Sequence, residues 1–302
     1  MATEADSPDK ASAQSMLDEL SIVIDQLTRA TINDKGIFGC ALRACVAKSF
    51  EFTSLAHQKP PPPHGFFITA TLRGICEDLI TFSFLNDLSE VDRVEALHLL
   101  MSTNIAEGIN AQSAFFKAMR PWQPVVQPPK IEKDTEQRLR VLSAKLGWSG
   151  RQAWPTVWYM AKATNLHDLY SYLYSTTSKW VHFSPQILLR MGWGGTLEDV
   201  GDHTEWVFST KNFTQYYVEF NRTYSLFLLL RLFRGPAASL LPDGAAKIID
   251  ALESFLNEPL RWPEAVTYEE LNIDGPKSFM RILLRAAHES PKENGNDPEP
   301  AA

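Results

Sequence analysis

The sequence predicts an all-α fold: a multi-helix bundle with a small β-hairpin or an ordered loop as an insertion. Apolar residues recur at intervals of three and four along most of the chain, and prolines and glycines separate these stretches. Of the 302 residues, 44% are hydrophobic and 11% are aromatic, which is enough to fill a sizeable core. Only the stretch from Gln186 to Thr210, where glycines alternate with short apolar runs, favours a hairpin.

The N-terminal half, residues 11–120, is expected to contain four helices. They are predicted over residues 13–31, 37–57, 66–86 and 89–120. The prolines at 60–63 separate the second helix from the third, because successive prolines cannot continue a helix. The third helix is apolar almost all round and should lie at the centre of the bundle. Ser89 supplies the N-cap of the fourth, with the acid Asp92 three residues later.

The proline-rich stretch from Pro121 to Pro129 marks the boundary with a C-terminal half, residues 130–288, which we expect to pack on the first half as one domain. Its helices are predicted over residues 130–146, 168–183, 212–234, 243–256 and 276–288. The polar segment 1–10 and the acidic segment 289–302 have almost nothing to bury and are expected to be disordered tails. The segment from Arg261 to Asn272 is polar and aromatic and is a candidate docking element.

The charge distribution argues against a protein that grips nucleic acid by bulk charge. The net charge is -7, but the two tails carry most of it, so the body of the chain is close to neutral. Nucleic-acid-binding domains normally show a basic stripe. RNA therefore stays open as a partner only through a local basic patch, beside an unknown protein partner, a small ligand or a second copy of the chain.

The location expected from the sequence is the cytoplasm, without a membrane segment. The N-terminus has no basic stretch followed by an apolar one, so it does not resemble a secretory signal. The longest apolar run, Tyr224–Phe233, is interrupted by Arg231 and is too short to cross a bilayer. Cys40, Cys45 and Cys76 lie in apolar surroundings and are expected to be buried, reduced thiols. No residues show metal-ligand spacing, so we expect neither metal nor cofactor.

Arg73 and Glu77 are the first pair of residues that suggests a site. They lie four apart on a mostly apolar stripe of the predicted central helix, so both should be at least partly buried. A buried arginine needs carboxylate or carbonyl partners, because its unpaired charge costs several kcal/mol. The pair is either an ion pair that fixes the register of neighbouring helices or part of a functional site.

A polar stripe on the predicted helix 168–183 is the second such feature. Its members recur at intervals of three and four between large apolar residues, and they are Asp168, Ser171, Ser175, Ser178 and His182. The stripe is therefore expected to be embedded in apolar surface, opposite something polar. If Arg73 and Glu77 meet Ser178 and His182 there, a carboxylate would orient the His182 ring as a general base requires. The alternative is a core histidine with satisfied hydrogen bonds.

These two segments resemble a known family. The helix Thr71-Leu72-Arg73-Gly74-Ile75-Cys76-Glu77 is similar to the Arg-(Ser/Thr)-Leu-x-Glu helix of the bacterial Domain of Unknown Function 5677 family. The segment Tyr174 to His182 is similar to that family's later Tyr/Ser/His helix. The resemblance covers roughly residues 37–234 and implies a helical fold, and little activity has been assigned to such proteins.

A more distant similarity is to the higher-eukaryote and prokaryote nucleotide-binding (HEPN) bundles. Some of these are metal-independent ribonucleases of toxin and phage-defence systems, in which an arginine precedes the active histidine by a few residues on one helix. Here Lys179 stands before His182, and Arg93 and His98, which have such a spacing, are on another helix. This departure weakens the argument for ribonuclease activity.

Two functional hypotheses follow, and the sequence does not decide whether the chain is an enzyme. The first is a binding or regulatory module of a bacterial stress or phage-defence system, with a buried Arg73/Glu77/Ser178/His182 cluster that is structural or holds a small ligand. The second is a metal-independent ribonuclease effector with His182 as the base and Arg73 as the phosphate-stabilising cation. An open cleft rimmed by basic residues would favour the second; the candidates for that rim are Lys130, Lys133, Arg138 and Arg140.

Overall fold

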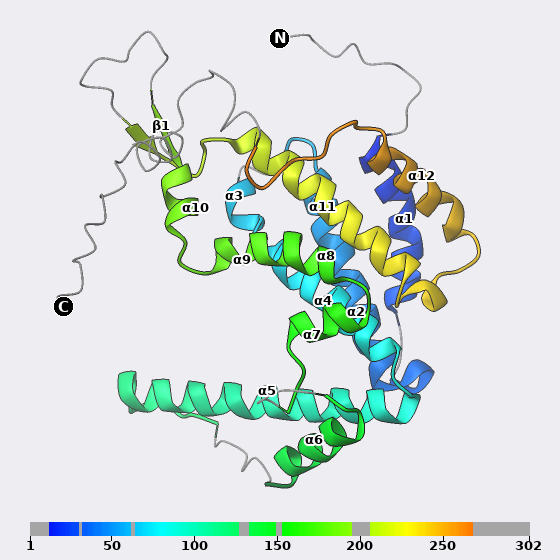
Figure 1. Cartoon of the computed structure of the whole chain (residues 1–302), viewed down its shortest axis with the longest axis vertical. Helices are drawn as coiled ribbons and strands as arrows, with labels where there is room; N and C mark the ends of the chain where they lie inside the picture. Colours follow the sequence, from blue (N-terminus) through cyan, green and yellow to red (C-terminus); the bar gives the residue numbers. More distant parts are fainter. Residues whose placement is uncertain are drawn as a thin grey trace, which may run out of the picture.

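The computed structural model describes residues 12–29, 32–61, 64–126, 133–148, 153–194 and 206–267. Its main helices in chain order are α1 (Ala13–Thr28), α2 (Ile32–His57), α3 (Gly65–Ile68), α4 (Thr71–Asn86), α5 (Glu90–Met119), α6 (Lys133–Lys145), α7 (Val157–Ala163), α11 (Thr214–Arg234) and α12 (Ala245–Asn257). The all-α fold class is confirmed (Figure 1). The predicted tails 1–10 and 289–302 and the predicted helix 276–288 lie outside the described residues.

The core forms around α11 and α4, which pack against each other and against α2. Every face of α11 contributes buried side chains, among them Tyr217, Phe220, Leu229 and Phe233. The expectation that the third predicted helix is central is confirmed, since α4 also contacts α7 and α9. α1 and α12 pack together beside α2 and α11 and close one side of the bundle (Figure 1).

The helix predicted over residues 66–86 is divided into α3 and α4. The carbonyl oxygen of Gly65, in the first turn, accepts hydrogen bonds from Thr69 Oγ1 at 2.8 Å and from Asn221 Nδ2 at 2.9 Å. Gly65 also lies so close to α11 that a Cβ placed on it would be 3.1 Å from Cβ of Tyr217. These side-chain contacts anchor α3 to α11, and a separate helix, α4, starts at Thr71.

Two other helix boundaries follow local sequence signals. α2 includes Gly36 in a positive-φ conformation (φ 63°), so regular helix begins at the next residue, Ile37, as predicted. Ser89 is the N-cap of α5, because its hydroxyl accepts a hydrogen bond from the backbone N–H of Asp92, also as predicted. Figure 1 shows the C-terminal half of α5 extending away from the bundle, while α6 packs against this helix.

The prediction of a single helix over residues 168–183 is wrong in detail. The chain there forms α8 (His167–Leu169), a π-helical segment η1 (Tyr170–Tyr174) and α9 (Ser175–Val181). A π-helix places one more residue in a turn than an α-helix does, so side chains before and after it no longer share the faces that a 3.6-residue period predicts. Residues 168–183 include no proline or glycine that would have indicated this change of helical period.

The expected hairpin is present. After α10 (Pro185–Arg190), β1 (Gly192–Gly194) pairs antiparallel with β2 (Trp206–Phe208), with Trp193 opposite Val207. A short 3-10 helix, η3 (Ala238–Leu240), links α11 to α12. Among the described residues, no helix is both long and apolar enough to span a membrane.

Candidate functional site

Arg73 lies on α4 and reaches the π-helical segment η1. Its guanidinium donates a hydrogen bond to the hydroxyl of Tyr174 at 3.0 Å and lies over the Tyr174 ring, 5.1 Å from the ring centre. The Tyr170 ring stacks on Tyr174 with a centroid distance of 4.8 Å. Arg73 is half-buried, as expected, and its Nε is buried without a hydrogen-bond partner among the described residues. The partner of this arginine is thus an aromatic side chain rather than a carboxylate.

Glu77 and Ser178 do not join Arg73 in a polar cluster. Glu77 is half-buried, and among the described residues no ion pair links it to Arg73. The hydroxyl of Ser178 donates to the carbonyl oxygen of Tyr174 at 2.7 Å, a bond within its own helix. Arg73 and Ser178 therefore contact the same residue through different atoms.

His182 lies just past the end of α9, where the backbone is extended (φ −102°, ψ 160°). Its side chain is exposed, as are those of Asp168 and Ser171. The expectation that the polar stripe is embedded in apolar surface is therefore wrong at these three positions. The π-helical segment changes the phase of the stripe, and the end of α9 turns the chain before His182.

The basic residues expected to rim a cleft lie on or before α6. Arg138 forms an ion pair with Glu95 of α5 at 2.7 Å, and Arg140 lies 3.9 Å from Glu136 in its own helix. Lys130 and the side chain of Lys133 lie outside the described part of the chain. Within the described ranges, no three His, Cys, Asp or Glu side chains are close enough to hold a metal ion.

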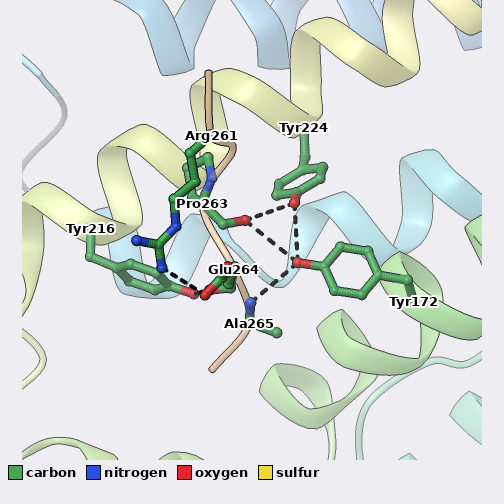
Figure 2. Close-up of polar contacts among 7 residues, drawn as sticks. All are labelled: Tyr172, Tyr216, Tyr224, Arg261, Pro263, Glu264 and Ala265. Carbon is green, nitrogen blue, oxygen red and sulfur yellow. Dashed lines mark hydrogen bonds and ion pairs between the residues drawn. The ribbon is translucent and has the colours of Figure 1, made fainter. Parts of the chain in front are cut away.

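A larger polar cluster lies where the segment after α12 crosses α11 and η1. We call residues Glu258–Thr267 the strap. Figure 2 shows it passing between Tyr216 and Tyr172, with Tyr224 beside it. Tyr216 and Tyr224 are on α11, and Tyr172 is on η1. The sequence suggested the segment from Arg261 to Asn272 as a docking element. Its described part, residues 261–267, packs against the same chain.

The tyrosines hold the strap by its backbone. Tyr224 donates to the carbonyl oxygen of Pro263 at 2.7 Å, and Tyr216 donates to that of Glu264 (Figure 2). The N–H of Ala265 donates to the hydroxyl of Tyr172 at 3.2 Å, and the hydroxyls of Tyr172 and Tyr224 are 3.1 Å apart. Since the Tyr224 proton is directed at Pro263, Tyr172 is the donor in the bond between the two hydroxyls. Ala265, Tyr172, Tyr224 and Pro263 therefore form one directed chain of hydrogen bonds.

Arg190 of α10 also binds the backbone of the strap. It is 3% exposed, donates to the carbonyl oxygen of Ala265 at 2.6 Å, and lies over the ring of Tyr216, 4.6 Å from its centre. Burial raises the pKa of both Tyr216 and Tyr224, against the lowering effect of Arg190 on Tyr216. Both phenols consequently stay protonated and keep their role as donors. Four side chains thus bind backbone atoms of three consecutive strap residues.

Beside the strap lies a cavity of about 380 Å³. Its aromatic wall is formed by Tyr172, Tyr224, Phe227 and Trp262, the last of which belongs to the strap. The Trp262 ring packs edge-on against Phe227 and Tyr224, with centroid distances of 5.4 and 5.9 Å. Arg231 and Asp168 are the charged residues that line the cavity. Among the described residues, Arg231 forms no hydrogen bond or ion pair.

The sequence reasoning missed this site, although two signals pointed to it. The segment Tyr170-Ser171-Tyr172-Leu173-Tyr174 concentrates three tyrosines in five residues, and Arg261-Trp262-Pro263-Glu264 was recognised only as a docking element. The contacts between them span about 90 residues, so no local pattern could join the two segments.

Comparison with family models supports the resemblance seen in the sequence. Residues 63–196 match the model of DUF5677, a family of unknown function. The DUF5677 match is narrower than the resemblance expected from the motifs, but it includes Arg73, Glu77, Ser178 and His182 together with η1. It ends before α11 and the strap, so it covers only Tyr172 and Arg190 of the residues that hold the strap. The comparisons with curated proteins and with solved structures returned no match.

Proposed function

We propose that the chain is a binding module, and that its ligand is a small aromatic molecule with an anionic group. The ligand would occupy the cavity between η1, α11 and the strap. The observation that carries this proposal is the combination of four aromatic side chains with an arginine that has no hydrogen-bond or ion-pair partner among the described residues. Ligand sites are typically apolar cavities with a few polar groups that fix orientation.

The aromatic walls would bind the flat part of the ligand. Tyr224 and Trp262 lie edge to face, and Phe227 packs against Trp262, so the wall is held rigid by its own contacts. A volume of about 380 Å³ suits a ligand of one or two fused rings. Arg231 would then bind the anionic group, since a guanidinium binds carboxylate and phosphate with two parallel hydrogen bonds.

The position of the cavity also supports a binding role. It lies against a π-helical segment, and such segments occur frequently at functional sites. One wall is part of the strap, so the conformation of the strap and occupancy of the cavity would depend on each other. This coupling is how a regulatory role, as the first hypothesis has it, would operate.

The ribonuclease alternative gains no specific support. It needs Arg73 and His182 at one open cleft, whereas Arg73 is bonded to Tyr174 and His182 is an exposed residue past the end of α9. A role in stress or phage defence likewise has no observation of its own. Binding of a small ligand is therefore the function that we carry forward.

The test is a calorimetric titration of the chain with 2-naphthoate and with its uncharged analogue 2-naphthamide. The wild type should bind the acid about tenfold more tightly than the amide, because a charge-assisted hydrogen bond contributes roughly 1.5–3 kcal/mol before desolvation is subtracted. Arg231→Gln should bind both equally. Arg140→Gln, which removes an exposed arginine of α6, is the matched control and should retain the preference. Absence of binding by the wild type, or a preference that survives Arg231→Gln, would refute the proposal.

A further inference from the structure

The C-terminal half of α5 exposes a row of large apolar side chains. Met101 is 42% exposed, Ile105 51%, Phe115 59% and Met119 61%, and Trp122, just past the helix end, is 73% exposed. Gly108 and Gln112 lie between them on the same face at the same spacing. We call these seven residues the α5 seam. It is separate from the cavity beside the strap.

The opposite face of α5 is already covered by the chain. Leu99, Ala106 and Ser113, which recur every seven residues, are 2%, 3% and 2% exposed. α6 packs against α5, and two ion pairs, Arg138 with Glu95 and Lys145 with Asp92, tie the two helices together. The exposed seam is thus a second face of α5, and the opposite face of this helix is already buried within the same chain.

The seam has the spacing of a coiled-coil interface. From His98 to Met119 the positions of this face follow at intervals of three, four, three, four, three and four, which is the a/d pattern of a heptad repeat. The flanking positions Ile109, Ala111, Phe116 and Ala118 are apolar, and the charged residues Glu107 and Lys117 lie off the seam. At the end of the seam, Arg120 lies over the Trp122 ring, 5.7 Å from its centre. A partner of this surface is therefore an apolar helix rather than nucleic acid.

From this pattern we propose that the α5 seam binds the α5 seam of a second copy of the chain, in an antiparallel pair of helices. About a two-fold axis near Asn110, Met101 lies opposite Met119 of the second copy, and Ile105 opposite its Phe115. Gly108 lies opposite Gln112 of the second copy. The same surface on both copies is what a two-fold dimer requires.

The central layer explains an otherwise unfavourable residue. A glycine inside an exposed helix costs up to about 1 kcal/mol relative to alanine. A Cβ placed on Gly108 would meet nothing within 4 Å in one copy, so no contact within the described chain requires a glycine there. Opposite Gln112 of a second copy, the missing side chain leaves room for the longer amide and for close approach of the two helices.

The exposed area agrees with a dimer. A fully buried aromatic side chain contributes roughly 150–250 Å², and Met and Ile contribute somewhat less. The exposed fractions of the five large seam residues therefore leave on the order of 600 Å² of apolar side chain on each copy. The pair would bury at most on the order of 1,200 Å², and this limit is at the lower end of the range for specific interfaces. A single copy with this patch is at the upper limit found for monomers.

The experiment is sedimentation equilibrium of the full chain at micromolar concentration. The wild type should have twice its chain mass of 34.0 kDa. Phe115→Glu should weaken the dimer at least about 100-fold, because it places a charge in two symmetric layers at once. Its helical circular dichroism should be unchanged, since Phe115 is 59% exposed in one copy. Ala114→Glu, on the same helix but off the seam, should remain dimeric. A monomeric wild type, or a dimer that persists in Phe115→Glu, would overturn the proposal.

The antiparallel register has its own test. A mixture of Gly108→Cys and Gln112→Cys chains should form mainly the mixed disulfide on mild oxidation, at a yield several-fold above that of either chain alone. A parallel pair would instead give two products, each joining identical positions. Either that result or cross-linking no stronger than in the wild type, which already has Cys40, Cys45 and Cys76, would contradict the antiparallel dimer.

Discussion

Arg73 is the residue whose sequence context and structural role can be compared most directly. Its position on an apolar stripe predicted partial burial, which is confirmed, and a carboxylate or carbonyl partner, whereas the partner found is a tyrosine. The partner itself was not predictable, because a tyrosine 101 positions away satisfies the guanidinium through its hydroxyl and its ring. The role of Arg73 that the contacts support is to hold α4 against η1.

Tyr174→Phe tests this role. The phenylalanine keeps the ring beneath the guanidinium but removes the only hydrogen-bond acceptor found for Arg73 among the described residues. We expect the free energy of unfolding to fall by about 1–2 kcal/mol, the usual effect of losing a hydrogen bond to a charged group. Denaturant unfolding measures it. Tyr159→Phe is the control, since its hydroxyl has no hydrogen bond within the described part of the chain. A loss as large in the control would contradict this role of Tyr174.

His57 gives the chain a pH-dependent stability. It is 6% exposed, and its Nδ1–H donates to the carbonyl oxygen of Thr53 at 2.9 Å. Burial lowers the pKa of His57 from 6.5 to about 4, against the hydrogen bond to Thr53 and with a smaller contribution from Arg222. Arg222 itself donates to the carbonyl oxygen of Ala56 at 3.0 Å at the end of α2.

The unfolded chain therefore takes up the His57 proton at a higher pH than the folded chain does. Stability is fully present above pH 6.5 and is lost as the pH falls toward 4, by up to about 3 kcal/mol. Melting temperatures measured across this range should fall less steeply in His57→Gln than in the wild type. His64→Gln, at an exposed position away from the α5 seam, should follow the wild type. Equal slopes in all three proteins would show that His57 is not the group responsible.

At the scale of elements, the strap depends on side chains of η1, α10 and α11. Tyr172 is the acceptor for the backbone N–H of Ala265, so Tyr172→Phe should leave this N–H unbonded. We expect hydrogen exchange in residues 258–267 to become about tenfold faster, which corresponds to the loss of roughly 1.4 kcal/mol. Mass-spectrometric exchange on the whole chain measures it. Tyr170→Phe, two positions earlier on the same π-helical segment, should leave the exchange rate unchanged. Equal exchange rates in the two variants would show that the Tyr172 hydroxyl does not hold the strap.

Most of the helices were predictable because their signals are local. The N-cap Ser89, the glycine at 36 and the proline runs set helix ends within a few residues of where they are found. The signals failed where a tertiary contact decides the local structure. α3 is held to α11 through the carbonyl oxygen of Gly65, and η1 takes a π-helical form that no residue type announces.

The same limit applies to the predicted cluster of Arg73, Glu77, Ser178 and His182, of which Arg73 and Ser178 contact a common residue, Tyr174. The stripe from Asp168 to His182 assumed one unbroken helical period. The change of period at η1 shifts Asp168 and Ser171 relative to Ser175 and Ser178, and α9 ends before His182. The tyrosines that do form a cluster come from η1 and α11, and their hydrogen-bond partners are backbone atoms of the strap. Their meeting depends on the packing of the whole bundle, which the intervals in the sequence do not contain.

At the scale of the whole molecule, the bundle presents two separate surfaces. The cavity beside the strap is lined by residues of η1 and α11 and by Trp262, and α5, which carries the seam, extends away from the other helices (Figure 1). α2 lies between them, because it packs on α5 and also on α11, which carries part of the cavity. The two proposals nevertheless rest on different residues, and the failure of one leaves the other standing.

The central claim is that the cavity between η1, α11 and the strap is the ligand site, and a crystal structure of the chain grown with 6-bromo-2-naphthoate tests it most directly. The account predicts an anomalous bromine peak among Tyr172, Tyr224, Phe227 and Trp262, with the carboxylate directed at Arg231. A peak elsewhere on the molecule, or an empty cavity at a saturating concentration of the compound, would contradict it.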